Sequence, residues 1–141
     1  MKECTLQDLP QGQRELLLAA EKAAMNSYSP YSGFKVGAAL LASSGEMFTG
    51  TNVENAGYSP TICAERAAIV SACSSGVQDF QAIAVISPSS GDTVGSPCGV
   101  CRQVLSEFSK DGDITVILSN ATKSRIIITS VAELLPLPFR L

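Results

Sequence analysis

The stretch GFKVGAALLASSGEMFTGTNVE occupies residues 33–54 and contains two runs typical of β-strands. We expect strands over residues 33–42 and 46–54, on either side of Ser43-Ser44-Gly45. A three-residue connection with glycine in last place suits a hairpin with a bulge. The sequence therefore predicts a β-hairpin, around which the remaining elements can be placed.

Helical patterns flank this hairpin on both sides. Upstream, apolar residues recur at helical spacing over about residues 11–25. Downstream, a helix is expected over about 63–75, where Gly76 supplies a common C-terminal stop. Another is expected over about 96–108, because proline, its second residue, is favoured in a first turn. Residues 130–133 have capping-box spacing, which predicts a short last helix.

The remaining apolar runs are short and predict further strands, at residues 82–87, 114–118 and 125–129. Because strands and helices alternate after the hairpin, we expect an α/β protein with three α-β-α layers and a mixed sheet of about five strands. No repeat, low-complexity tract or linker-like change in composition divides residues 1–141, so a single domain is expected.

Histidine is absent from the 141 residues. This absence excludes a Ser-His-Asp triad, a Cys-His dyad, a histidine general base and a histidine metal site. Ten basic residues stand against thirteen acidic ones, which gives a formal net charge of −3. Proteins that bind a phosphate backbone usually carry a basic stripe, so we expect no nucleic-acid partner.

The first eight residues, MKECTLQD, lack the apolar core of a signal peptide. The longest apolar stretch, residues 36–42, is far shorter than the ~20 residues of a membrane span. We therefore expect a cytoplasmic protein without a membrane partner. The chain has five cysteines, and in the cytosol this odd number favours metal binding or catalysis over a disulfide framework.

Two segments with cysteines each begin a predicted helix, namely Cys63-Ala64-Glu65 and Pro97-Cys98-Gly99-Val100-Cys101. Cys98 and Cys101 are three apart and share one face of a turn, whereas Cys63 and Glu65 can serve one site only if Cys63 lies at its helix end. Helix N-termini stabilise thiolates. The three cysteines are therefore predicted to bind a soft divalent metal, zinc by preference.

Three protein ligands leave one zinc position open, as in catalytic sites that activate water. Glu65 is then the expected proton acceptor. Two other interpretations stay open: a redox pair formed by Cys98 and Cys101, and a structural zinc site with Cys4 or Cys73 as fourth ligand. We expect Cys4, in the N-terminal tail, and Cys73, near the far end of its helix, to pack as small apolar residues.

Four blocks resemble the small cytidine deaminases of pyrimidine salvage, in the same order and over nearly the whole chain. They are YSGFKVGAAL (31–40), GTNVENA (50–56), CAER (63–66) and PCGVCRQ (97–103). The resemblance implies a cytidine deaminase-like fold and an enzyme. Its reaction would be the zinc-dependent hydrolysis of cytidine and deoxycytidine to uridine and deoxyuridine, with release of ammonia.

The same resemblance implies roles for residues around the metal. Glu65 would carry protons from water to N3 of the base and then to the leaving amine. The backbone groups of Ala64 and Ser96 would read the edge of the pyrimidine. Arg66 would hydrogen-bond the cysteine sulfurs and relieve the net negative charge of three thiolates on zinc.

Other residues are implied in sugar and base binding. Asn52 and Glu54 are two apart on a predicted strand, so their side chains point to the same face. The resemblance assigns them to the ribose hydroxyls. Their spacing alone also fits the solvated end of a strand. Phe34 would contact the base, whereas a phenylalanine before an apolar strand is more often in the core. Small family members are homotetramers in which a phenylalanine enters a neighbour's site, and Phe139 stands at that position, in an apolar tail that favours burial between subunits.

Two alternatives to a cytidine deaminase are retained. One is a relative that acts on a modified cytosine nucleoside, such as a blasticidin-type deaminase. The other is a non-catalytic, zinc-stabilised binding module, for which Glu65 would be dispensable. We expect a small-molecule nucleoside without a 5′-phosphate as substrate, because the helix N-termini near the motifs are committed to thiolates and Glu54 would repel an anion.

Overall fold

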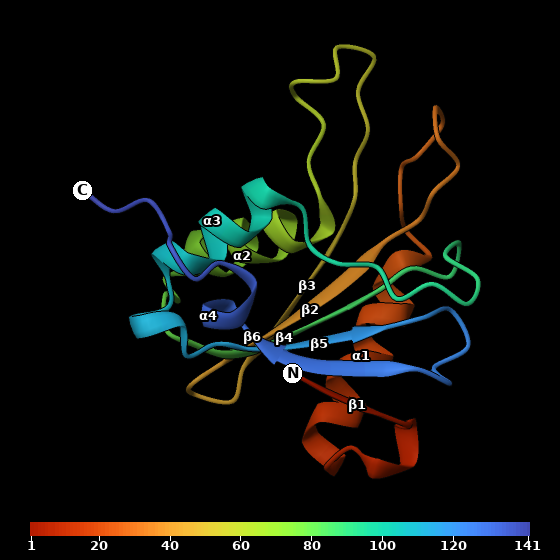
Figure 1. Cartoon of the computed structure of the whole chain (residues 1–141). Coiled ribbons are helices and arrows are strands. Elements are labelled where there is room, and N and C mark those ends of the chain that lie inside the picture. The colour runs from red at the N-terminus through yellow and green to blue at the C-terminus, as the bar shows by residue number, and fades with distance from the viewer.

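A six-stranded mixed sheet forms the centre of the computed structural model, which describes residues 1–141 (Figure 1). The strands are β1 Lys2–Cys4, β2 Gly37–Ala42, β3 Met47–Thr51, β4 Phe80–Ile86, β5 Thr115–Ser119 and β6 Ile126–Ser130. Their order across the sheet is β1-β6-β5-β4-β2-β3, and only β4 and β5 pair in parallel. The helices are α1 Gln11–Ala24, α2 Ala64–Ser74, α3 Gly99–Glu107 and α4 Val131–Leu134, with short 3-10 turns at Leu6–Asp8 and Lys110–Gly112.

Helices cover both faces of the sheet: α1 lies on one face, and α2, α3 and α4 lie on the other (Figure 1). Alternate residues of β2 therefore enter different cores, with Ala39 facing α1 and Leu40 facing α2. This confirms the predicted three-layer α/β fold. None of the helices combines the length and apolar character that crossing a membrane requires.

The predicted strand count was one too low, because the N-terminal segment that holds Cys4 is a strand and not a tail. β1 pairs antiparallel with β6, with Lys2 opposite Ile128. Side chains hold it there, since Arg125 donates to Glu3 over 2.8 Å and the amino group of Met1 lies 2.9 Å from Glu133. A strand of three residues is too short to show an alternating pattern.

Three predicted boundaries were wrong by three residues or more. The strand expected over residues 46–54 ends at Thr51. The strand expected from residue 33 begins at Gly37, because residues 31–36 form a loop. The helix expected from residue 96 begins at Gly99, after the proline, because Cys98 is its N-cap and its sulfur accepts from the Cys101 N–H over 3.5 Å. The last helix begins as predicted, with the Ser130 side chain accepting from the backbone of Glu133.

Two glycines let the helices approach the sheet closely. A Cβ on Gly37 would lie 1.8 Å from the carbonyl oxygen of Ala20 in α1, and a Cβ on Gly50 would lie 2.4 Å from that of Ala64 in α2. Both distances are far below contact, so any side chain at these positions would push the helix away. Gly50 therefore fixes the height of the first turn of α2 above the sheet.

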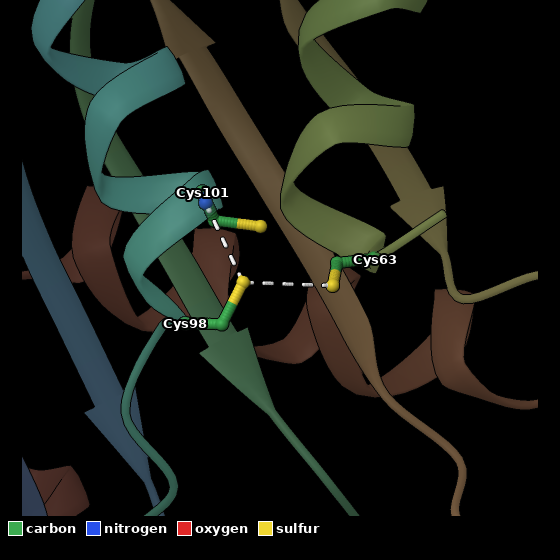
Figure 2. Close-up of side chains that lie close together, drawn as sticks. All are labelled: Cys63, Cys98 and Cys101. Carbon is green, nitrogen blue, oxygen red and sulfur yellow. Dashed lines mark hydrogen bonds between the residues drawn. The ribbon is translucent and has the colours of Figure 1, made fainter. Parts of the chain in front are cut away.

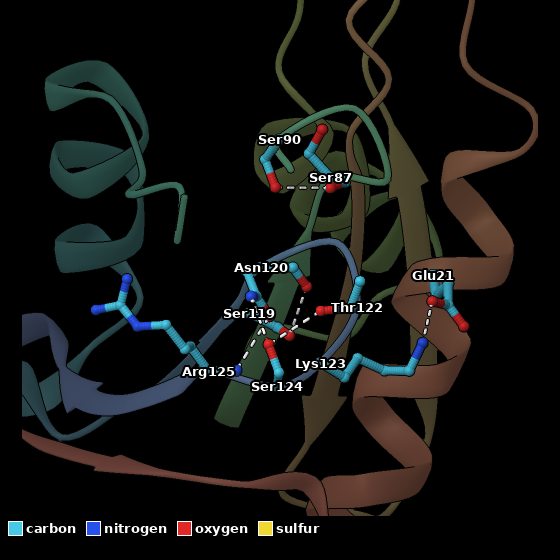
Figure 3. Close-up of polar contacts among 9 residues, drawn as sticks. All are labelled: Glu21, Ser87, Ser90, Ser119, Asn120, Thr122, Lys123, Ser124 and Arg125. Carbon is cyan, nitrogen blue, oxygen red and sulfur yellow. Dashed lines mark hydrogen bonds and ion pairs between the residues drawn. The ribbon is translucent and has the colours of Figure 1, made fainter. Parts of the chain in front are cut away.

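The β5–β6 loop is tied to α1 and to itself (Figure 3). Lys123 pairs with Glu21 of α1. Asn120 is fully buried, and its side chain accepts from the Arg125 N–H over 3.1 Å and donates to Ser124 over 2.9 Å. Because buried polar groups are satisfied here, the carboxyl end of β5 is held firmly.

Candidate active site

Three cysteine sulfurs converge where α2 and α3 begin, and Figure 2 shows their side chains pointing toward one another. Cys63 is the N-cap of α2, Cys98 is the N-cap of α3, and Cys101 lies one turn further. The three Sγ atoms lie within 4.8 Å of one another, and those of Cys63 and Cys98 are 3.9 Å apart. Sulfurs bound to one zinc at about 2.3 Å lie about 3.8 Å apart in a tetrahedral site. The cluster therefore fits zinc.

The charge on these sulfurs is unevenly shared. The Cys101 thiol donates to Cys63, and with help from Arg66 this lowers the pKa of Cys63 to about 5. The pKa of Cys101 is raised, because its proton is held by Cys63 and because it is buried. Nη2 of Arg66 donates to the Cys63 sulfur over 3.4 Å. A divalent metal would replace the shared proton, with Arg66 placed to offset the remaining negative charge.

Glu65 lies in the first turn of α2, next to the sulfurs, and its side chain faces the same cavity as Cys63. It is 5% exposed and is the only charged residue among the buried ones. Burial raises the pKa of its carboxyl group above the usual range. A carboxylate without solvent and without an ion-pair partner is suited to accepting and returning protons.

A cavity of about 250 Å³ opens beside the cysteine cluster. Its lining includes most of the residues expected from the sequence, namely Phe34, Asn52, Glu54, Cys63, Ala64, Glu65, Ser96 and Cys98. Phe34 is 44% exposed and lines the cavity, so it is not a core residue. Cys101 is fully buried behind the lining.

Asn52 and Glu54 line the cavity side by side, and both also hold the loop that precedes β2. Oδ1 of Asn52 accepts from the Val36 N–H over 2.9 Å, and its Nδ2 donates to the Phe34 carbonyl over 2.8 Å. Glu54 accepts from the Ser32 hydroxyl over 2.5 Å and from the backbone N–H of Ser32 over 3.1 Å. These bonds lower the pKa of Glu54, so it is ionised at neutral pH.

Two serines of the cavity were missed by the sequence analysis. Ser87 follows β4 and Ser119 ends β5, and both line the cavity while being almost fully buried. The carboxyl ends of adjacent parallel strands meet at one edge of a sheet, where α/β proteins bind ligands. That rule could have identified both serines once β4 and β5 were taken as parallel neighbours.

Phe139 does not line the cavity of its own chain. It is 70% exposed, and its backbone is bracketed by Gln103, which accepts from its N–H over 3.1 Å and donates to its carbonyl over 2.9 Å. Cys4 and Cys73 lie outside the sulfur cluster and pack against the two cores. Neither offers the cluster a fourth ligand.

Known proteins match this chain in sequence and in fold. The family model for the cytidine and deoxycytidylate deaminase zinc-binding region matches residues 10–118. A cytidine deaminase of Sporosarcina psychrophila is 48% identical over 122 residues, which are 86% of this chain and 87% of the relative. The blasticidin-S deaminase of Bacillus cereus is 32% identical over 110 residues, 74% of this chain and 76% of that protein.

Among solved structures, a crystal structure of cytidine deaminase from Burkholderia pseudomallei has a TM-score of 0.82 and 42% sequence identity, covering 93% of this chain and 100% of that one. The family model spans both cysteine segments and most of the sheet. By sequence, by fold and by its convergent sulfurs, the chain belongs to the zinc-binding family of cytidine and deoxycytidylate deaminases.

Proposed function

We propose that this protein is a cytidine deaminase, which hydrolyses cytidine and deoxycytidine to uridine and deoxyuridine and releases ammonia. The observation that carries the proposal is the buried carboxyl group of Glu65, which lines the cavity beside a cluster of three converging sulfurs. The similarity to relatives named cytidine deaminase, at 48% and 45% identity, supports the same activity.

In this proposal Cys63, Cys98 and Cys101 hold zinc, which acts when bound as a Lewis acid that lowers the pKa of water toward neutrality. Glu65 accepts a proton from the attacking water and passes it to N3 of the base. It then assists the protonation of the amine that leaves from C4. The raised pKa of Glu65 suits this work, because its protonated and ionised forms lie closer in free energy near neutral pH.

The remaining cavity residues bind the nucleoside. Ala64 is the first residue of α2, so its N–H has no partner within the helix and can donate to the pyrimidine edge. Ser96 lines the same cavity and offers its backbone carbonyl. Asn52 and Glu54 provide polar groups for the ribose hydroxyls, and Phe34 offers an aromatic face to the base.

A second candidate substrate is a modified cytosine nucleoside, because blasticidin-S deaminase is 32% identical to this chain, but the 48% identity to a cytidine deaminase favours cytidine. Ammonia release from cytidine, deoxycytidine and blasticidin S separates these candidates from each other and from a binding module without activity. We expect turnover of cytidine and deoxycytidine, its loss after treatment with a strong chelator, and recovery with zinc. Turnover of blasticidin S alone would overturn the assignment.

We further propose a homotetramer in which Phe139 enters a neighbour's cavity, and a cytoplasmic location, where the three thiols would stay reduced. Leu137 and Phe139 are 91% and 70% exposed, an apolar pair that favours burial between subunits. Light scattering at micromolar concentration should give four chains per particle. Phe139→Ala should weaken nucleoside binding without loss of zinc, and a monomeric particle would contradict this arrangement.

A further inference from the structure

The rim of the cavity before α3 is a segment without regular structure, residues 94–97. Gly95 and Ser96 of this segment line the cavity beside Cys98. None of the four residues makes a backbone–backbone hydrogen bond. The carbonyl oxygen of Ser96 therefore has no partner in the chain and is free to accept a hydrogen bond from a ligand.

One side chain holds this segment in place. From α3, the guanidinium group of Arg102 donates to the Pro97 carbonyl through Nε over 2.8 Å and to the Ser96 hydroxyl through Nη2 over 2.5 Å. These are the only hydrogen bonds of residues 94–97. Through Nη1 the same group donates to the Leu134 carbonyl over 2.8 Å, at the end of α4, which packs beside α3 (Figure 1).

Arg102 is well suited to fixing geometry. Its planar group carries N–H donors in a rigid fork, so three bonds to three acceptors define both its own orientation and that of the segment. It forms no ion pair, and all three partners are neutral oxygens. Since it does not line the cavity, it reaches a bound nucleoside only through Ser96 and Pro97.

We propose that Arg102 is a positioning residue for recognition of the amine. It holds the Ser96–Pro97 backbone so that the Ser96 carbonyl oxygen accepts a hydrogen bond from the 4-amino group of the cytosine ring. This inference rests on the proposed deamination of cytidine. Its consequence is selective: substrates that carry the amine depend on Arg102, and ligands without it do not.

Uridine is the matched probe, because it has the same sugar and ring but an oxygen at C4 that cannot donate to a carbonyl. In Arg102→Gln we expect the KM for cytidine to rise about tenfold, while the inhibition constant of uridine changes less than twofold and zinc stays at about one per chain. Arg102→Lys keeps one donor group and should recover part of the cytidine KM.

The proposal would be overturned if Arg102→Gln weakened the binding of cytidine and uridine equally, or if it lowered Tm without changing the KM for cytidine. Either result would show that Arg102 only supports the fold. Arg125→Gln is the control, since this exposed arginine pairs with Glu3 at the far edge of the sheet. It should leave both constants unchanged.

Ser96→Ala keeps the test decisive if Arg102→Gln does not fold, because it removes one of the two rim bonds and leaves Arg102 in place. We expect the cytidine KM to rise about threefold and the uridine constant to stay the same. An unchanged cytidine KM in Ser96→Ala would overturn the proposal. A wild-type protein that releases no ammonia from cytidine would instead contradict the proposed function.

Discussion

The two faces of the sheet differ in the side chains that they bury. The buried cluster under α1 consists of aliphatic side chains, and the buried residues of this helix are Leu16, Leu17, Ala20 and Ala24. The face under α2 and α3 also has a core of large apolar side chains, such as Leu40, Phe80 and Leu105. On this side, however, Glu65 and Cys101 are buried as well. Burying a carboxyl group without a charged partner is unfavourable for folding.

The difference indicates a division between stability and chemistry. Apolar packing on both faces contributes to the free energy of unfolding and offsets the cost of burying Glu65 on one of them. Substitutions on the α1 face should therefore change stability without changing turnover per folded molecule. Substitution of Glu65, at the start of α2, should do the reverse, whereas loss of a zinc ligand should lower both turnover and stability. The following variants test this separation.

The largest effect is expected from Cys98→Ala, because losing one of three sulfurs should abolish zinc binding and with it all measurable ammonia release. Metal analysis and the ammonia assay measure both. Cys73→Ala is the control, since this half-buried cysteine lies on α2 outside the cluster and should leave zinc content and turnover intact. Full zinc content in Cys98→Ala would refute the ligand assignment.

The next largest effect is expected from Glu65→Gln, which keeps the shape of the side chain but removes the proton acceptor. General acid–base groups accelerate reactions by about 10²–10⁴-fold, so kcat should fall by at least about 10²-fold. Zinc content should be unchanged, and Tm should be no lower than in the parent, since a neutral amide is easier to bury than a carboxylate. Glu15→Gln, at an exposed position of α1, should leave kcat, zinc content and Tm unchanged.

On the opposite face, Leu17→Ala should destabilise the fold by about 2–5 kcal/mol through lost burial and the cavity that remains. Leu17 is fully buried. Urea unfolding measures the loss, and kcat per folded molecule should stay within twofold of the parent. Leu18→Ala is a matched control, because this neighbouring leucine is 42% exposed and should change stability by less than about 1 kcal/mol. A tenfold lower kcat in folded Leu17→Ala would show that the two faces are not independent.

The smallest effect is expected from Glu54→Ala, since Glu54 lies at the mouth of the site and anchors the loop at Ser32. The KM for cytidine should rise about tenfold, through lost hydrogen bonds and a looser loop, with zinc content unchanged. Glu46→Ala, in the exposed turn of the same hairpin, should have no effect on KM. An unchanged KM in Glu54→Ala would remove this residue from the binding site.

The sequence allowed the chemical centre to be predicted more closely than its surroundings. Cys63, Glu65, Cys98 and Cys101 could be brought together because each pair is close in sequence and each motif opens a helix. Local rules also placed the last helix at Ser130. Residue type and spacing carry this information without any knowledge of distant contacts.

What could not be predicted depends on contacts between distant residues. β1 exists because three residues pair with β6 at the other end of the chain. Residues 31–36 are a loop because Asn52 and Glu54 bind their backbone, and the rim at Ser96 is held from Arg102. Such side-chain bonds to backbone have no spacing rule, so only the folded chain shows them.

Gly50 has a practical consequence for engineering. Any side chain there would lift the first turn of α2, which carries Cys63 and Glu65, relative to the sulfurs of α3. Zinc tolerates deviations of only about 0.2 Å in its ligand distances. In a mutational scan for activity, position 50 should therefore be as intolerant as the residues that move protons. Replacing this glycine with valine to strengthen the strand would therefore inactivate the enzyme, because the new side chain would displace α2 and its active-site residues.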